Sequence, residues 1–187
     1  MEILKMLDCV YQFQKTFKCV QSDRLSLLLQ KDRQRRFSLQ KEEWDEYKLA
    51  VRHNNKEEML DAIVDGVYIC LGTILAHGYK NFTEHETKST DSLDLILFNM
   101  KDSYISGRLT SAEILHYHKT IFESLIHLFQ DGVNKGYWES NFIDVFLEVH
   151  NSNMSKLDEN GNPIFRADGK VLKGLNFVKP DIKKFIL

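Results

Sequence analysis

Residues 62–76 read "AIVDGVYICLGTILA", an almost continuous run of apolar and small side chains that contains one carboxylate, Asp65. The run is shorter than the roughly 20 residues that a membrane-spanning helix needs. It therefore predicts the most buried helix of a folded domain. An isolated ionised carboxylate in an apolar interior is very costly unless it is paired or binds a metal ion. The rest of the chain must supply a partner for Asp65.

The composition favours helices and a single domain. The chain has 187 residues, of which 43% are hydrophobic and 28% charged, with only two prolines and nine glycines. These values predict one all-α domain that covers residues 1–187. The net charge of −2 argues against wholesale nucleic-acid binding. We expect neither a nucleic acid nor a membrane as a partner.

The cysteines and the N-terminus indicate the compartment. Cys9, Cys19 and Cys70 are odd in number and show no CxxC spacing, which is typical of reduced thiols. The first residues, "MEILKMLDCVYQF", lack the apolar region and cleavage site of a secretory signal. We therefore expect a cytoplasmic protein.

Helical periodicity covers most of the chain. It predicts a polar loop at 81–91, a short apolar segment at 92–100 and helices over about 4–18, 33–53, 56–78 and 139–151. A further helix begins with a capping box at Thr110 and ends just before Gly132, which suits the left-handed position after a helix. The first helix is expected to bury Leu4, Leu7, Val10, Tyr11 and Phe17.

Two pairs of acidic residues lie on two successive predicted helices. Glu43 and Glu46 are three residues apart, and Asp61 and Asp65 are four apart, so each pair shares a helix face. Because the connection between the helices is short, we expect the helices to pack antiparallel, with the pairs facing one another. Four inward carboxylates repel unless a cation sits among them, and Mg²⁺ prefers such oxygen ligands.

Two other interpretations of these acids stay open. Glu42, Glu43 and Glu46 could form a solvated charged face, and Asp65 could pair with a lysine or arginine. The apolar neighbours of Asp65 argue against simple solvation. We expect its compensation to be a cation shared with Glu43 and Glu46 rather than a lysine of the same bundle.

The C-terminal segment from Asn151 onward is polar, turn-rich and basic. It carries Lys156, Arg166, Lys170, Lys173 and Lys179 among small polar residues. Lysines on loops suit phosphate oxygens, although a solvated surface tail is an equally good interpretation. Elsewhere, His118 falls on an apolar stripe and is expected to be a core histidine. The "RQRR" run at 33–36 could reach phosphates, but such a run is more often a solvated helix start.

The acidic helices and the tail together resemble a known family. The blocks "RFSLQKEEWDEYKLA" and "DAIVDGVYICLGTILAHG" resemble the paired motifs of the all-α nucleoside triphosphate pyrophosphohydrolases. The tail, "FLEVHNSNMSKLDENGNPIFRADGKVLKGLNFVKPDI", looks like that of the MazG-like branch, which is common in phages and some bacteria and is related to dimeric dUTPases.

The resemblance implies a MazG-like helical bundle with an irregular tail. It implies a homodimer or homotetramer that hydrolyses a nucleoside triphosphate to a monophosphate and pyrophosphate. The implied cofactor is Mg²⁺, with Mn²⁺ as a substitute. By position, the implied metal ligands are Glu43, Glu46, Asp65 and, as a substitute for a family acid, Asp61, with Glu42 and Glu43 as catalytic residues. The implied phosphate and nucleotide contacts are Asn153, Lys156, Lys170 and Lys173.

The chain departs from the family pattern at two places. Residues 81–132 form an expected helical insertion, and Gly66 replaces a large aliphatic residue, which suggests tight helix packing. The leading hypothesis is a Mg²⁺-dependent pyrophosphohydrolase of (d)NTPs, with dUTP or dCTP as the narrowest guess, that controls a nucleotide pool. If the protein is phage-encoded, it acts in the host cytoplasm. The alternatives are a nucleotide-binding protein of the same fold without turnover, and a helical interaction module.

Overall fold

The computed structural model describes residues 2–79, 82, 92–167 and 169–187 and shows an all-helical fold. Within these residues there is no β-strand, only three isolated bridges. The all-α fold class is therefore confirmed. In chain order the elements are α1 (Ile3–Thr16), α2 (Gln30–Arg52), α3 (Lys56–Ala76), α4 (Leu93–Ser106), α5 (Ser111–Asn134), α6 (Phe142–Met154) and the short 3₁₀ helix η1 (Ile182–Phe185).

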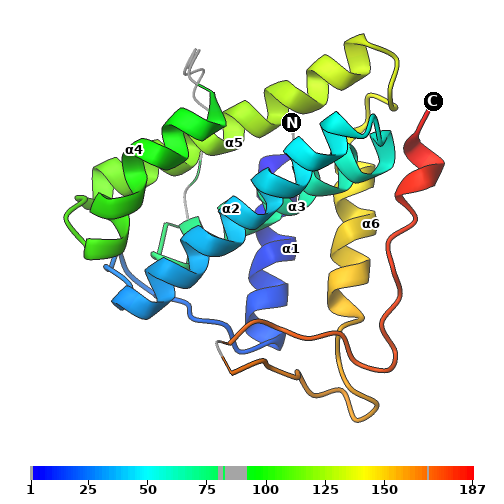
Figure 1. The fold of residues 1–187 in the computed structure, drawn as a ribbon. Coiled ribbons are helices and arrows are strands. Elements are labelled where there is room, and N and C mark those ends of the chain that lie inside the picture. Colours follow the sequence, from blue (N-terminus) through cyan, green and yellow to red (C-terminus); the bar gives the residue numbers. More distant parts are fainter. Residues whose placement is uncertain (1, 80–81, 83–91, 168) are drawn as a thin grey trace.

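Helices α2 and α3 form an antiparallel hairpin with a very short connection (Figure 1). Asn54 in the turn has a φ of 52°, a left-handed conformation that asparagine adopts more readily than most residues. Asn55 then caps α3, because its side chain accepts a hydrogen bond from the backbone N–H of Glu58 at 3.2 Å. The turn fixes the relative register of the two acidic helices.

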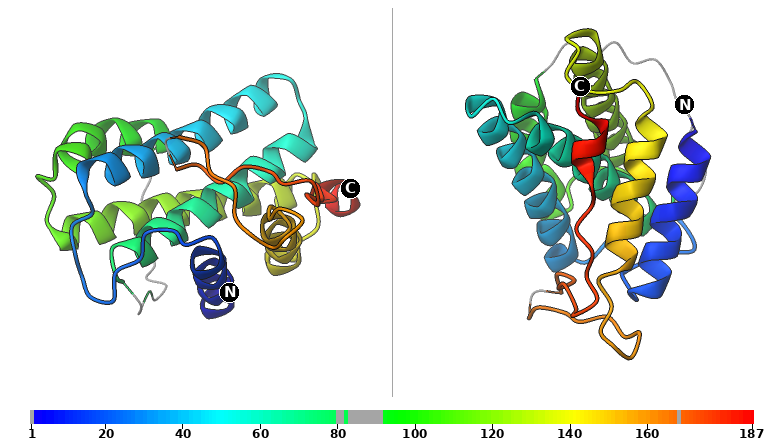
Figure 2. Two further views of the ribbon diagram at one scale, coloured as in Figure 1. Left: turned by 90° about the horizontal axis from the view of Figure 1, so that it is seen from below. Right: turned by 90° about the vertical axis from the view of Figure 1, so that its right-hand side faces the viewer.

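Helix α3 is the centre of the bundle and is buried on most sides. Helices α4 and α5 pack on one side of the α2–α3 hairpin, and α1 and α6 lie next to each other on the other side (Figures 1 and 2). By length and composition α3 is also the one described helix that could cross a membrane, but most of it is buried by the other helices. The C-terminal segment runs from α6 across the bundle toward α2 and returns to η1.

The region of the expected insertion forms α4 and most of α5. The segment predicted as a short apolar stretch at 92–100 is the first part of the longer helix α4. The predicted loop at 81–91 lies outside the described residues except for Phe82, whose buried ring meets Phe122 edge-on at 5.3 Å. The capping box at Thr110 is confirmed. Because α5 packs along α3, this region is part of the core.

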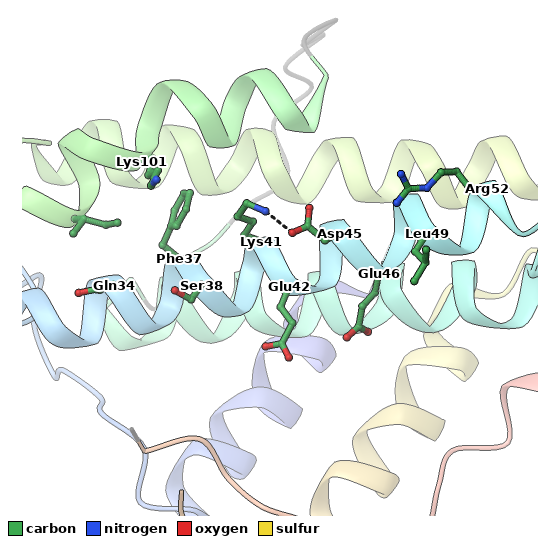
Figure 3. A pocket seen from close by; sticks show the side chains of 11 residues that line it. Gln34, Phe37, Ser38, Lys41, Glu42, Asp45, Glu46, Leu49, Arg52 and Lys101 are labelled. Atoms are coloured by element: carbon green, nitrogen blue, oxygen red, sulfur yellow. Dashed lines mark hydrogen bonds and ion pairs between the residues drawn. The ribbon is translucent and has the colours of Figure 1, made fainter. Parts of the chain in front are cut away.

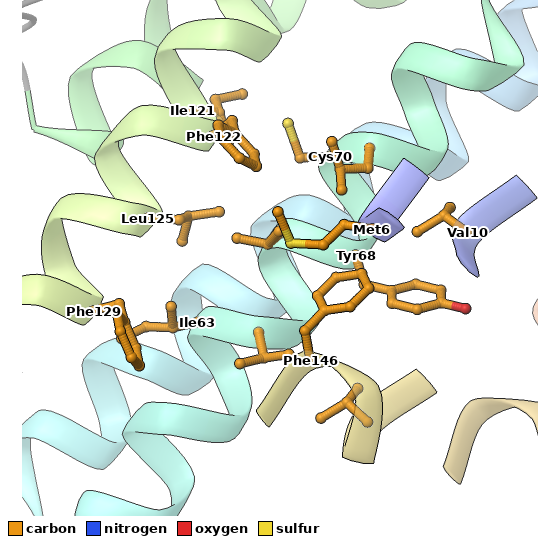
Figure 4. Close-up of a cluster of buried hydrophobic side chains, with 14 of the residues drawn as sticks. Met6, Val10, Ile63, Tyr68, Cys70, Ile121, Phe122, Leu125, Phe129 and Phe146 are labelled. Carbon is orange, nitrogen blue, oxygen red and sulfur yellow. The ribbon is translucent and has the colours of Figure 1, made fainter. Parts of the chain in front are cut away.

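The core joins aliphatic and aromatic side chains of α1, α3, α5 and α6 (Figure 4). Tyr68 stacks on Phe146 at 5.4 Å and meets Phe13 edge-on at 5.6 Å. The predicted inner face of α1 was partly wrong, because Leu4 is 67% exposed and Tyr11 is exposed as well. Leu7 and Val10 are buried as predicted, and α1 also buries Ile3, Met6, Cys9 and Gln14.

Gly132 does not end its helix, contrary to the sequence prediction. It lies within α5, which continues to Asn134, and the left-handed glycine is Gly136 with a φ of 66°. The physical reason is packing. A Cβ on Gly132 would lie 1.9 Å from Cζ2 of Trp138, whose buried ring crosses this part of the helix and whose Nε1 donates to the carbonyl of Phe129 at 2.9 Å.

We expect Gly132→Ala to destabilise the protein. Overpacking against a rigid buried ring costs about 1–3 kcal/mol, which corresponds to a fall in Tm of roughly 2–10 °C for a chain of this size. Thermal unfolding followed by circular dichroism measures the effect. The exposed helical residue Asn134 provides a control, since Asn134→Ala should leave Tm almost unchanged. An unchanged Tm for Gly132→Ala would show that Trp138 does not pack as described.

His118 is a core histidine, as predicted. It is 4% exposed, and its Nδ1 lies 2.7 Å from the carbonyl oxygen of Ile114, to which it donates in the neutral form. The ring also meets Tyr104 edge-on at 5.6 Å. Burial lowers the pKa of His118 to about 4, and the nearby His77 and Arg36 act in the same direction.

The low pKa of His118 predicts a loss of stability in mild acid. The unfolded chain binds the proton from about pH 6.5 downward, whereas the folded protein resists it until about pH 4, so the free energy of unfolding falls across this window. The full difference corresponds to about 3 kcal/mol. Urea unfolding at several pH values should show a flatter profile for His118→Gln than for the exposed control His116→Gln. If the free energy of unfolding of both variants depended on pH in the same way, the low pKa of His118 would be contradicted.

Candidate active site

One acidic residue from each helix of the hairpin lines a common cavity. Glu43 on α2 and Asp65 on α3 both border a cavity of about 160 Å³. Both side chains are partly buried. Because α2 and α3 run antiparallel, the two acidic motifs meet at the same height along the hairpin. The structure thus brings these two predicted residues together.

The acids near this cavity repel one another. Burial, followed by Asp65 and Glu46, raises the pKa of Glu43 to about 9. Burial and Asp65 also raise the pKa of Asp61 to about 7. Burial and Glu42 raise the pKa of Glu46. These side chains form a concentrated negative site that calls for a counter-charge.

The donor chemistry of this acidic site fits a hard divalent cation such as Mg²⁺, which prefers carboxylate oxygens. Asp61 supports this fit, because its Oδ1 is buried and has no hydrogen-bond partner. The side chains are not arranged as a ready-made site, however. Over the described part of the chain, no group of three histidine, cysteine, aspartate or glutamate side chains is placed to hold a metal ion.

Glu42 and Glu46 are more exposed to solvent than Glu43. Both are exposed, which differs from the inward face predicted for Glu46. They border a groove of about 660 Å³ along α2. In Figure 3 they extend from the side of α2 opposite to Lys41 and Asp45. Helix geometry explains the difference, because residues four apart on α2 share a face and this face lies at the rim of the cavity.

The predicted phosphate-binding residues of the tail divide into two groups. Asn153, which is 7% exposed, and Lys156 line the cavity, and Lys156 Nζ donates to Asn153 Oδ1 at 2.5 Å. Lys170 also lines the cavity and forms an ion pair with Glu42 at 2.8 Å. Lys173 is exposed, and its amine lies over the ring of Phe177 at 4.5 Å, outside the cavity lining.

Lys156 and Asn153 of the tail favour the charged form of Asp65, which the sequence did not lead us to expect. Burial raises the pKa of Asp65, while Lys156 is the strongest influence in the opposite direction, followed by a hydrogen bond from Asn153. Burial in turn lowers the pKa of Lys156, opposed by Asp65. The net pKa of Asp65 stays raised, so compensation by a cation shared with Glu43 and Glu46 remains a prediction. Lys156 and Asp65 line the same cavity.

The interpretation of the "RQRR" run as a solvated helix start was wrong for Arg33 and Arg36, whereas Gln34 is exposed. Arg33 is buried and donates from Nε to the carbonyl of Tyr104 at 2.8 Å and from Nη2 to that of Ile105 at 2.9 Å, at the end of α4. Arg36 is buried and lines the cavity. A signal was present, because Arg36 precedes Glu43 by seven residues, two turns of the same helix face.

Other cavity residues come from α1 and the segment after it, where the sequence showed no chemical motif. They supply the wall opposite the acidic helices and consist mainly of apolar, aromatic and amide side chains. These residues are Val10, Phe13, Gln14 and Cys19.

A comparison with known protein families matches the part of the chain that carries the two acidic helices. Residues 10–84 match the phosphoribosyl-ATP pyrophosphohydrolase family. The matched segment contains α2, α3 and both acidic motifs but not the tail that carries Lys156. No curated protein and no solved structure matches the chain. The match supports a pyrophosphohydrolase type of activity on nucleotides, carried by an all-helical fold.

Proposed function

We propose that the protein is a Mg²⁺-dependent nucleoside triphosphate pyrophosphohydrolase of the MazG-like branch, with Mn²⁺ as a substitute cofactor. The observation that carries the proposal is the shared cavity of Glu43, Asp65, Asn153 and Lys156. It places carboxylates from a segment similar to pyrophosphohydrolases next to a cation and an amide from the tail. The resemblance of the tail to MazG-like proteins supports the choice of branch.

The acids would hold the divalent cation. Glu43, Glu46, Asp61 and Asp65 are the residues that we expect to bind it. Such an ion, when bound, neutralises phosphate charge and lowers the pKa of an attacking water. Glu42, whose carboxylate lies 2.8 Å from Lys170 Nζ, accepts the proton of that water at the rim of the cavity.

The bond changes define the role of the lysines. Water forms a bond to the α-phosphorus, the bond from this phosphorus to the bridging oxygen breaks, and pyrophosphate leaves with the added negative charge. Lys156 and Lys170 stabilise this developing charge, with Lys173 as a more distant cation. Asn153 holds Lys156 in place through their 2.5 Å hydrogen bond.

The direct test is a panel of ribo- and deoxynucleoside triphosphates incubated with the purified protein and Mg²⁺, with pyrophosphate release as the readout. We expect turnover of a pyrimidine nucleotide such as dUTP or dCTP. A second candidate is a nucleotide-binding protein without turnover, which the present spread of Glu42 and Glu46 away from the cavity favours. Binding measured by calorimetry without pyrophosphate release would support this second function.

We also propose a homodimer or homotetramer in the cytoplasm, as the family resemblance implies. Exposed apolar side chains on α4 are consistent with such contacts, notably Phe98 and Leu95. Light scattering of the purified protein measures the state directly. A monomer at micromolar concentration would contradict this part of the proposal.

A further inference from the structure

Arg36 is a buried cation that the mechanism above does not use. Its side chain is 9% exposed, and its Nε is buried without a hydrogen-bond partner. Burial, together with the neighbouring Arg35, lowers its pKa. A buried charge that lacks a full set of partners destabilises the fold. Such a residue points to a ligand that completes its hydrogen bonds.

Arg36 lies at the opposite end of the cavity from the acids. It precedes Glu43 by seven residues on α2, which is about 10 Å along a helix. On the antiparallel helix α3, Gly72 follows Asp65 by the same number of residues. A Cβ on Gly72 would lie 3.1 Å from Arg36 Nη1 and 3.1 Å from Gln14 Nε2, so the glycine makes room for both side chains.

The walls at the Arg36 end suit a flat ring. Val10, Phe13, Tyr68 and Ile69 line the same cavity as Arg36 and supply apolar and aromatic surface. Arginine can only donate hydrogen bonds, so the ligand must present an acceptor. The cavity of about 160 Å³ is smaller than the 300 Å³ or more of pockets that enclose whole ligands. It has room for a single ring, with the rest of the ligand toward the acids.

We infer that Arg36 binds the exocyclic carbonyl oxygen of a pyrimidine base and thereby selects pyrimidine nucleotides. The inference rests on the proposed function and names its substrate class. The base lies between Arg36 and the aromatic wall, and the phosphates extend toward Glu43, Asp65 and Lys156. Uracil, thymine and cytosine all carry such a carbonyl. Adenine carries none, and guanine is a two-ring base.

The test compares Arg36→Met and Arg36→Lys with wild type on dUTP, dCTP and dATP. We expect kcat/KM for the pyrimidine nucleotides to fall about 10- to 100-fold in both variants, mainly through KM, since a hydrogen bond from a charged group is lost or misplaced. Activity on dATP should change less than about threefold. Lys41→Met, on an exposed position of the same helix, should behave as wild type.

The thermal stability of the ligand-free variants gives an independent readout. Arg36→Met removes a buried charge, so its Tm should equal or exceed that of wild type. A lowered Tm or an unfolded Arg36→Met protein would show a structural role and overturn the inference. An equal loss of activity on dATP and the pyrimidine nucleotides would also overturn it, because Arg36 would then contact phosphate.

Binding without turnover separates this inference from the proposed function. Calorimetry of wild type and Arg36→Met with dUMP, dCMP and dAMP needs no hydrolysis. Pyrimidine binding that depends on Arg36, in a protein that releases no pyrophosphate, would support the base contact and refute the enzyme. Turnover with no dependence on Arg36, or a wild type without preference for pyrimidines, would refute the base contact alone.

Discussion

Asp65→Asn is expected to lower kcat about 10³-fold while leaving the helical fold intact. Asp65 interacts with the other acids of the site. Besides burial, its charge raises the pKa of Glu43, Glu46 and Asp61. It also lies opposite Lys156 in the cavity. Replacing one charged oxygen by an amide nitrogen removes a proposed metal ligand from this site. Pyrophosphate release at saturating nucleotide and Mg²⁺ measures the loss.

The control is Asp102→Asn on α4. Asp102 is exposed and lies outside the lining of the cavity, so this variant should keep wild-type turnover. Asn is close to Asp in shape and removes one of several like charges, and circular dichroism and Tm should therefore be preserved in Asp65→Asn. Glu46→Gln should also abolish turnover. Wild-type activity in either the Asp65 or the Glu46 variant would refute the assignment of the metal site.

Lys156→Met is expected to lower kcat/KM about 10²-fold. Its amine is half-buried between Asp65 and Asn153, so it meets the substrate as a cation already freed of part of its water. Methionine keeps the length of the side chain but removes the charge that we propose to stabilise pyrophosphate as it leaves. Steady-state kinetics with the preferred nucleotide measures the effect.

The exposed Lys183 of η1 provides the control for this second variant. Lys183→Met removes an equal charge far from the cavity lining and should leave kinetics unchanged. If both lysine variants lost activity equally, a general charge effect on substrate attraction would explain the loss. If neither did, Lys156 would have no part in the reaction.

The bundle could be predicted from local patterns, because the helices carry helical periodicity, and α3, α4 and α5 also have side-chain caps at their N-termini. The hairpin of α2 and α3 followed from two acidic pairs and a short connection, and the capping box at Thr110 marked the start of α5. Gly132 was misassigned because its role is set by Trp138, a residue that reaches it only in the folded chain. Local sequence cannot distinguish a glycine that ends a helix from one that accommodates a ring.

The candidate site was harder to predict than the fold. Carboxylates in an apolar helix were visible in the sequence, and so was a basic tail. The burial of Arg33 and Arg36 was harder to predict, because a run of charges at the start of a helix usually faces water and outweighed the spacing of Arg36 from Glu43. Their partners are the end of α4 and the cavity behind α1, which are set by tertiary packing.

The route of the tail has a consequence for how the protein is made. Lys170 binds Glu42, and Arg35 donates to the carbonyl of Gly169 at 3.0 Å, so the last part of the chain returns to the second helix. A ribosome therefore completes the acidic hairpin long before it releases the lysines that balance it. Until residues 153–171 emerge, the nascent chain presents repelling carboxylates without their counter-charges. We expect nucleotide binding to become possible only after residues 153–171 have folded back onto the hairpin.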